Sequence, residues 1–129
     1  MIQEHKELLL KDICARLPYN VICQVEFKEN GMYNSKVMLL SGIFTDEAYF
    51  TTKGGSIYSN EYKPYLFPLS SMTEKQSKEY HELIGGMFGT SALINFEILE
   101  DFFHKNHLDY RGLIEKSLAL DATNLRIYE

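Results

Sequence analysis

The sequence has few cysteines. Cys14 and Cys23 are the only two in 129 residues, and they lie nine positions apart, a spacing that matches no zinc or redox motif. Cys14 falls on an apolar helical stripe and Cys23 on the apolar phase of a strand, so we predict two buried thiols, with a disulfide between them as the alternative. A chain of this length buries enough surface to fold without disulfides or metal. A reducing cytoplasm is the expected compartment.

Long apolar runs and surplus positive charge are also missing. No apolar run approaches the roughly 20 residues of a membrane-spanning helix, and the charged N-terminal residues are unlike a secretory signal. Lysine and arginine number 13 against 18 aspartates and glutamates, which gives a net charge of −5. Duplex nucleic acid and anionic lipid both require a basic surface. We therefore expect neither a membrane nor nucleic acid as a partner.

Prolines are few as well, and two of the three, Pro64 and Pro68, lie close together. Around them the period of the hydrophobic pattern changes from 2 to about 3.6 residues. The pattern before them is typical of strands and the pattern after them of helices. We predict one domain over residues 1–129, with a β-rich half at about 19–69 and a helical half at about 73–121.

The β-rich half follows a predicted opening helix. Leu9, Ile13 and their neighbours form an apolar stripe over residues 3–17, with Asp12 among the polar residues expected to face water. Asn30-Gly31 predicts a hairpin turn, and Gly42 a bulge. The extended segment with the two prolines should lie at a sheet edge, because proline lacks a donor. The predicted strands cover residues 21–27, 36–44, 48–52, 57–59 and 62–69.

The helical half begins with a capping box formed by Thr73 and Gln76. The helix that follows is apolar on one face through Phe88, and a shorter helix is expected at 96–105. Asp109 is expected to cap a last helix that ends near Leu120. The predicted fold is therefore α+β: a small, strongly bent antiparallel sheet, either open or closed into an SH3-like barrel, packed by an N-terminal helix and three C-terminal helices.

Aromatic residues gather in the β-rich half, since the chain has nine tyrosines and no tryptophan. Tyrosines and lysines on a small barrel can form a groove for a peptide or for single-stranded nucleic acid, and the low basicity favours a peptide. Tyrosine is also an ordinary residue of half-buried strands, so a purely structural role is the alternative. The candidate binding residues are Tyr49, Tyr58, Tyr62, Tyr65, Lys53 and Lys63.

A second candidate site is the cluster of Asp101, His104 and His107. Their spacing of three residues places them on successive turns of a helix, as in some metal sites. A third fixed ligand is not evident, because Asn106 is expected to end the helix, and the alternative is a solvated helix end. We predict no resident cofactor for this protein. The cluster is the basis of the rival hypothesis, a metal-dependent enzyme or ligand sensor.

Three segments resemble a family of small proteins found in Bacteroides genomes, their phages and their mobile elements. They are ELLLKDICARLPY (residues 7–19), KPYLFPLSSMTE (63–74) and KNHLDYRGLIEK (105–116), about a third of the chain. The resemblance implies a cytoplasmic protein of phage or mobile-element origin. No catalytic residue transfers with it.

No constellation of catalytic residues is apparent in the sequence. We therefore expect a non-enzymatic adaptor that binds a host or phage protein through an aromatic surface on its sheet. The sequence leaves open whether the protein forms a homo-oligomer.

Overall fold

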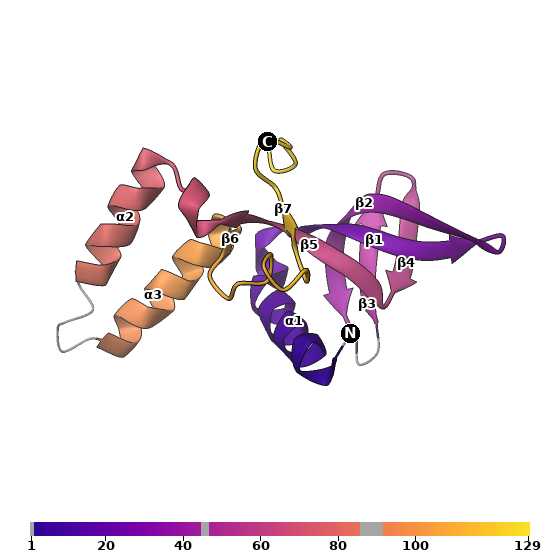
Figure 1. The fold of residues 1–129 in the computed structure, drawn as a ribbon, viewed down its shortest axis with the longest axis horizontal. Coiled ribbons are helices and arrows are strands. Elements are labelled where there is room, and N and C mark those ends of the chain that lie inside the picture. Colours follow the sequence, from indigo (N-terminus) through magenta and orange to yellow (C-terminus); the bar gives the residue numbers. More distant parts are fainter. Residues whose placement is uncertain (1, 45–46, 86–91) are drawn as a thin grey trace.

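The structure is a computed structural model that describes residues 2–44, 47–85 and 92–129, with backbone alone at 92–95. A curled sheet and an N-terminal helix form one end of the molecule, and a pair of helices forms the other (Figure 1). The C-terminal segment runs between the two ends. Among the described helices, none has the length and apolar character needed to cross a membrane.

The opening helix, α1 (Gln3–Arg16), has the predicted bounds to within one residue and leads into a short 3-10 helix, η1 (Leu17–Tyr19). Its buried residues are Leu9, Asp12, Ile13 and Arg16. This face is rotated away from the predicted stripe, so the prediction that Asp12 faces water is wrong. Cys14 is exposed, which contradicts the prediction of a buried thiol, whereas Cys23 is buried as predicted; both are free.

Within the described residues the sheet has seven strands, in the order β4-β3-β2-β1-β5-β6, and β7 also pairs with β5. Neighbours from β4 to β5 are antiparallel, whereas β6 and β7 run parallel to β5. The strands are β1 (Ile22–Glu29), β2 (Met32–Ile43), β3 (Ala48–Thr52), β4 (Gly55–Ser59), β5 (Glu61–Pro68), β6 (Leu108–Asp109) and β7 (Leu120–Asp121).

The predicted hairpin turn joins β1 to β2. Asn30 has φ 53° and Gly31 has φ 80°, as a two-residue turn of type I′ requires. The register between β2 and β3 shifts between Leu40 and Gly42, which confirms the predicted bulge. These two features set the length and the bend of β2.

The α+β class and the bent sheet are confirmed, but the barrel is not closed. The Ser59 hydroxyl donates a hydrogen bond of 2.6 Å to the carbonyl oxygen of Glu26, which draws the end of β4 towards β1. No strand ladder joins β4 to β1 or β5 within the part of the chain that the structure describes. The sheet therefore curls around its core with a gap between its ends.

β5 is not the edge strand that its prolines predicted. It pairs with β1 through Glu61–Pro64 and with β6 and β7 further along. Pro64 lies opposite Cys23. Because the β1–β5 pairs alternate between bonded and non-bonded, Pro64 occupies a non-bonded position where no donor is needed. Proline is therefore compatible with an interior strand here.

Two C-terminal helices are described, α2 (Glu74–Gly85) and α3 (Ala92–Lys105), rather than three. The capping box is confirmed, because Thr73 Oγ1 accepts from the Gln76 amide and Gln76 Oε1 accepts from the Thr73 amide. The end of the predicted apolar stripe at Phe88 lies outside the described residues. The predicted helix from Asp109 to Leu120 is instead a series of turns, in which Gly112 has φ 73° and Ser117 φ 60°. Such left-handed residues interrupt a right-handed helix.

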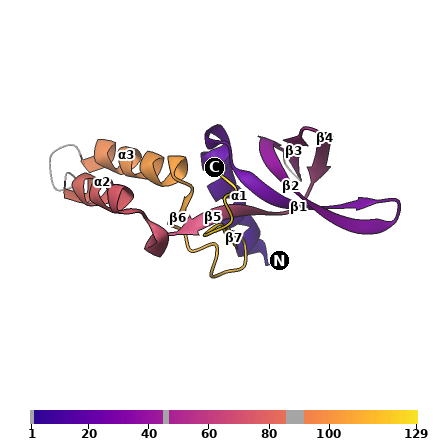
Figure 2. The same cartoon turned by 90° about the horizontal axis from the view of Figure 1, so that it is seen from above.

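The buried side chains that the structure describes form two clusters. The larger lies between α1 and the inner face of the sheet and includes Ile13, Val25 and Phe50. The smaller joins α3 to β6 through Phe102 and Leu108, with α2 packed against it. Figure 2 shows α2 and α3 side by side, apart from the sheet.

Candidate functional site

Three aromatic side chains form a partly exposed cluster, which we call the aromatic patch: Tyr49 of β3, Tyr58 of β4 and Phe44, which directly follows β2. Tyr49 and Tyr58 are cross-strand partners with ring centroids 4.9 Å apart. The Phe44 ring lies 5.7 Å from that of Tyr58. Phe44 remains 53% exposed and Tyr58 56%. Contact between exposed rings leaves a continuous apolar surface open to water.

The other predicted tyrosines lie elsewhere. Tyr62 points into the core, where its ring is 5.2 Å from that of Phe50, and burial raises its pKa to about 12. Tyr65 is half-buried, and its carbonyl oxygen accepts a hydrogen bond from the Tyr128 hydroxyl. Of the four candidate tyrosines, the structure brings together only Tyr49 and Tyr58.

The predicted lysines are both exposed, Lys53 at the turn between β3 and β4 and Lys63 on β5. Lys63 lines a hollow of about 770 Å³ between α1, β5 and the end of β2, into which Phe44 also projects. Leu9, Leu10 and Tyr62 supply its apolar surface. Its charged residues are two lysines and four glutamates: Lys6, Lys63, Glu7, Glu26, Glu47 and Glu61.

A buried ion network lies away from the hollow, where α1 meets the segment after α3. Asp12 and Arg16 are fully buried and form a salt bridge of 2.7 Å. Arg111 Nε lies 3.1 Å from the other oxygen of Asp12. Arg16 Nη2 donates to the carbonyl oxygen of Leu108 at 2.6 Å. One carboxylate thus holds two guanidinium groups and ties the N-terminal helix to β6.

His104 belongs to the same network, through Tyr110. Arg111 Nη2 donates to the Tyr110 hydroxyl at 2.9 Å, and that hydroxyl lies 2.9 Å from His104 Nε2. The hydroxyl accepts from Arg111 and keeps both a proton and a second lone pair, so it can bond to either tautomer of His104. Burial, followed by the nearby Arg16 charge, lowers the pKa of His104 and favours its neutral form.

The structure does not assemble a metal site from Asp101, His104 and His107. Asp101 accepts a hydrogen bond from the Tyr19 hydroxyl on the surface. His107 stacks on the Tyr128 ring, with centroids 3.7 Å apart. Within residues 2–44, 47–85 and 92–129, no group of three or more His, Cys, Asp or Glu side chains is placed to hold a metal ion.

Stability should fall as the solution is acidified below pH 6.5, because of His107. Burial, followed by the Arg16 charge, lowers the pKa of folded His107 from 6.5 to about 4. Between these values the unfolded chain takes up a proton that the folded chain does not. We expect the free energy of unfolding to drop by about 1 kcal/mol between pH 6.5 and 5, after allowance for partial exposure.

Urea titrations at several pH values measure this slope. His107→Asn should flatten it, since asparagine tolerates the left-handed conformation at φ 56° but does not titrate. His81→Asn, at an exposed position of α2, is the matched control and should keep the wild-type slope. An unchanged slope in His107→Asn would contradict the assignment.

Sequence reasoning missed Phe44 as a contact residue, and it missed Asp12, Arg16 and Arg111 as partners. Phe44 ends an apolar run and looks like any core residue. The i, i+4 spacing of Asp12 and Arg16 was the available signal for an ion pair. Nothing in their local sequence indicates that the pair is buried.

The comparisons with known proteins returned no match: no family model fits the chain, and no curated protein or solved structure is significantly similar to it.

Proposed function

We propose that this protein is a non-enzymatic binding module that holds a basic peptide segment of a partner protein at the aromatic patch and the adjoining hollow. The observation that carries the proposal is the contact between Phe44 and Tyr58, both more than half exposed, together with the place of Phe44 in the lining of the hollow. Exposed aromatic rings beside an apolar recess are typical of protein contact sites.

The hollow favours a partner with both apolar and basic side chains. Leu10 is 40% exposed, and with Phe44 it offers an apolar surface for an aliphatic or aromatic anchor. Four glutamates against two lysines give the lining a net negative charge (2 − 4 = −2). The whole chain is also acidic. Complementary charge on the partner would speed the encounter and discriminate against acidic segments.

The rival hypothesis of a metal-dependent enzyme has less support. His104 already faces the Tyr110 hydroxyl, and Asp101 already accepts from Tyr19. A metal would have to displace these partners before it could bind. Zinc or manganese bound stoichiometrically by tag-free protein, and lost in His104→Ala, would favour the rival.

The setting of the proposed module rests on the resemblance of its three segments to proteins of Bacteroides phages and mobile elements. That resemblance supports a cytoplasmic location and a host or phage protein as the source of the peptide. The low basicity of the chain argues against nucleic acid as the ligand.

Selection of random peptides against the immobilised protein tests the proposal. We expect the enriched peptides to carry lysine or arginine together with a large apolar residue. Tyr58→Ala should weaken their binding about tenfold in calorimetric titration, as is usual for an aromatic contact residue. Leu10→Asn should weaken it comparably, because it places a polar amide in the apolar recess without changing the charge of the lining.

Tyr33→Ala is the matched control. Tyr33 is also an exposed tyrosine on a strand, 74% accessible, but it lies near the tip of the β1–β2 hairpin. This variant should bind the selected peptides like the wild type. Peptides without basic residues, bound equally well by the Tyr58→Ala and Leu10→Asn variants, would overturn the proposal.

A further inference from the structure

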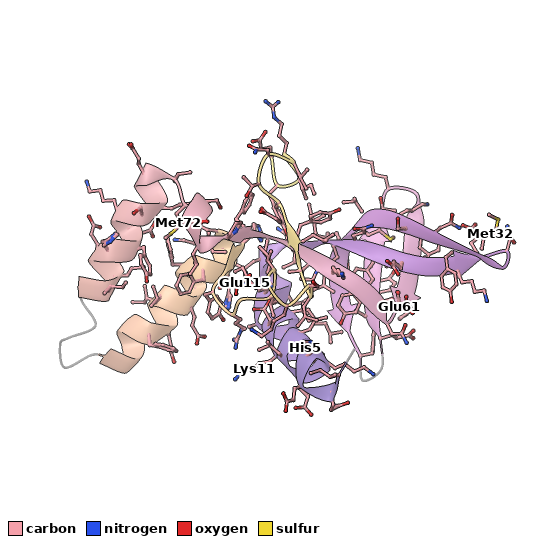
Figure 3. The ribbon with its side chains drawn as sticks, in the orientation of Figure 1. His5, Lys11, Met32, Glu61, Met72 and Glu115 are labelled. Atoms are coloured by element: carbon pink, nitrogen blue, oxygen red, sulfur yellow. The ribbon has the colours of Figure 1, made fainter. Side chains whose placement is uncertain are left out.

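The outer half of the β1–β2 hairpin stands free of the rest of the molecule (Figures 1 and 2). β5 pairs with β1 only over Cys23–Glu26, and β3 pairs with β2 only from Leu39 onward. Every residue from Met32 to Val37 is exposed. Figure 3 shows Met32 at the outer end of this ribbon, away from the helices.

The free edge of β2 carries open backbone groups. The hairpin closes on the pair Glu29 and Met32, and in a two-residue hairpin that pair exchanges both ladder bonds. Bonded pairs then recur at every second residue, so the even-numbered residues of β2 bond to the β1 side. The Leu40 amide, which donates to the Val21 carbonyl oxygen, follows this alternation. The backbone N–H and C=O groups of Tyr33, Ser35 and Val37 therefore point away from β1.

The edge from Met32 to Val37 lacks the features that usually block a further strand, and it ends where β3 begins to pair with β2 at Leu39. Natural sheets protect open edges with proline, bulges or charged side chains. Met32–Val37 contains no proline, and its one charged residue is Lys36. The Lys36 ammonium lies 5.9 Å from the Phe27 ring centroid, so it extends towards β1 rather than across the edge.

We propose that a second copy of this chain occupies the edge, with β2 paired antiparallel to β2 of the other copy about a two-fold axis at Asn34. The two hairpins then form one continuous four-stranded ribbon. Tyr33 of each copy exchanges two backbone hydrogen bonds with Ser35 of the other. Such edge-to-edge pairing is a common route to sheet extension.

In this register no cross-strand row of the outer face holds two like charges; the charged residues of a row lie about 14 Å apart on the two outer strands, so the effect on stability is small. On the outer face Glu26 is opposite Ser35, and Lys28 is opposite Tyr33, within each hairpin. An axis at Ser35 would place two copies of Glu26 in one cross-strand row, and an axis at Tyr33 would do the same with Lys28. An axis at Asn34 instead places Glu26 of one copy in the row of Lys28 of the other.

The charges on the inner face of the ribbon are also compatible with an axis at Asn34. Within each hairpin Met32 is opposite Glu29, and Lys36 is opposite Val25. With the axis at Asn34, Met32 of one copy lies beside Lys36 of the other, so each inner row also holds one lysine and one glutamate. The pairing covers Met32 and Tyr33, which are 70% and 74% exposed in the single chain.

The contact is short, and its area falls below that of standard stable interfaces. We therefore expect a dimer that forms reversibly as the concentration rises through the micromolar range. The aromatic patch lies on β3 and β4, on a different part of the sheet, so dimerisation and peptide binding can be tested separately.

Cross-linking tests the register. Non-bonded antiparallel pairs have Cα atoms about 4.5 Å apart, within the range of a disulfide. In a Cys14→Ser background, which removes the exposed native thiol, Asn34→Cys should form a covalent dimer on mild oxidation. Ser56→Cys, at an exposed serine of β4, is the matched control and should stay monomeric.

Sedimentation of the native chain tests the pairing itself. Ser35→Pro removes an N–H that faces the open edge and leaves the β1–β2 ladder intact. We expect this variant to weaken dimerisation at least tenfold while its circular dichroism is unchanged. A chain that remains monomeric up to millimolar concentration would overturn the proposal. So would a dimer that is equally stable in Ser35→Pro and is not cross-linked by oxidation of the Asn34→Cys variant.

Discussion

Asp12→Ala is expected to lower the free energy of unfolding by about 3–5 kcal/mol, the usual result of removing one member of a buried ion pair. The Asp12 carboxylate is fully buried and faces both Arg16 and Arg111. Without it, the buried Arg16 guanidinium loses its counter-charge in a medium where water cannot replace it. Chemical denaturation followed by circular dichroism measures the loss.

Two further variants define the origin of this effect. Glu7→Ala, on the exposed side of the same helix, should change stability by less than about 0.5 kcal/mol. The double variant Asp12→Leu/Arg16→Met should be more stable than Asp12→Ala, because no buried charge of the pair is left alone. If Asp12→Ala unfolds at the wild-type denaturant concentration, the network does not join the two parts of the chain.

Phe50→Ala is the second large effect, also about 3–5 kcal/mol. Phe50 is fully buried in the sheet core, and its ring packs against Tyr62 and faces α1 through the same cluster. Truncation leaves a cavity that strands held by backbone ladders cannot readily fill. Thermal and urea unfolding both measure the change.

Tyr58→Ala is the control for Phe50→Ala. It removes an aromatic ring one strand away, but on the outer face, where 56% of the side chain is exposed. Its loss of stability should stay below about 1 kcal/mol. Equal losses in the two variants would mean that the sheet is not buried on the face that the structure assigns to the core.

Local patterns explain why much of this fold could be predicted. A two-residue hairpin turn of type I′ requires positive φ at two successive residues, and Asn30-Gly31 tolerates it. Thr73 and Gln76 satisfy each other's amides without help from the rest of the chain. Such elements depend on neighbours in the sequence, so they can be read from it.

The wrong predictions concern places where segments distant in the sequence meet in the fold. The face of α1 turns towards Asp12 and Arg16 because Leu108 and Arg111 supply their partners from the far end of the chain. The residues after Asp109 do not form a helix, although the Asp109 carboxylate does accept from the Leu113 and Ile114 amides as a cap would. The left-handed Gly112 lies between cap and amides and turns the chain aside.

The candidate site was predicted only in part, because local strand pairing can be predicted from the sequence and the choice of buried face cannot. Tyr49 and Tyr58 are cross-strand neighbours across a short hairpin, and their contact follows from the strand pattern. Tyr62 has the same local sequence character but belongs to the opposite face of β5, opposite Val25. Which face of each strand is buried depends on α1, and no local pattern indicates that.

Amide chemical shifts of isotope-labelled protein, titrated with a selected peptide that carries lysine and leucine, give the most direct test of the binding surface. We expect saturable changes at Phe44, Tyr49, Tyr58 and Leu10, with the hairpin residues Met32–Val37 unaffected. Changes confined to α2 and α3, or none at millimolar peptide, would contradict the assignment of the aromatic patch as the contact surface.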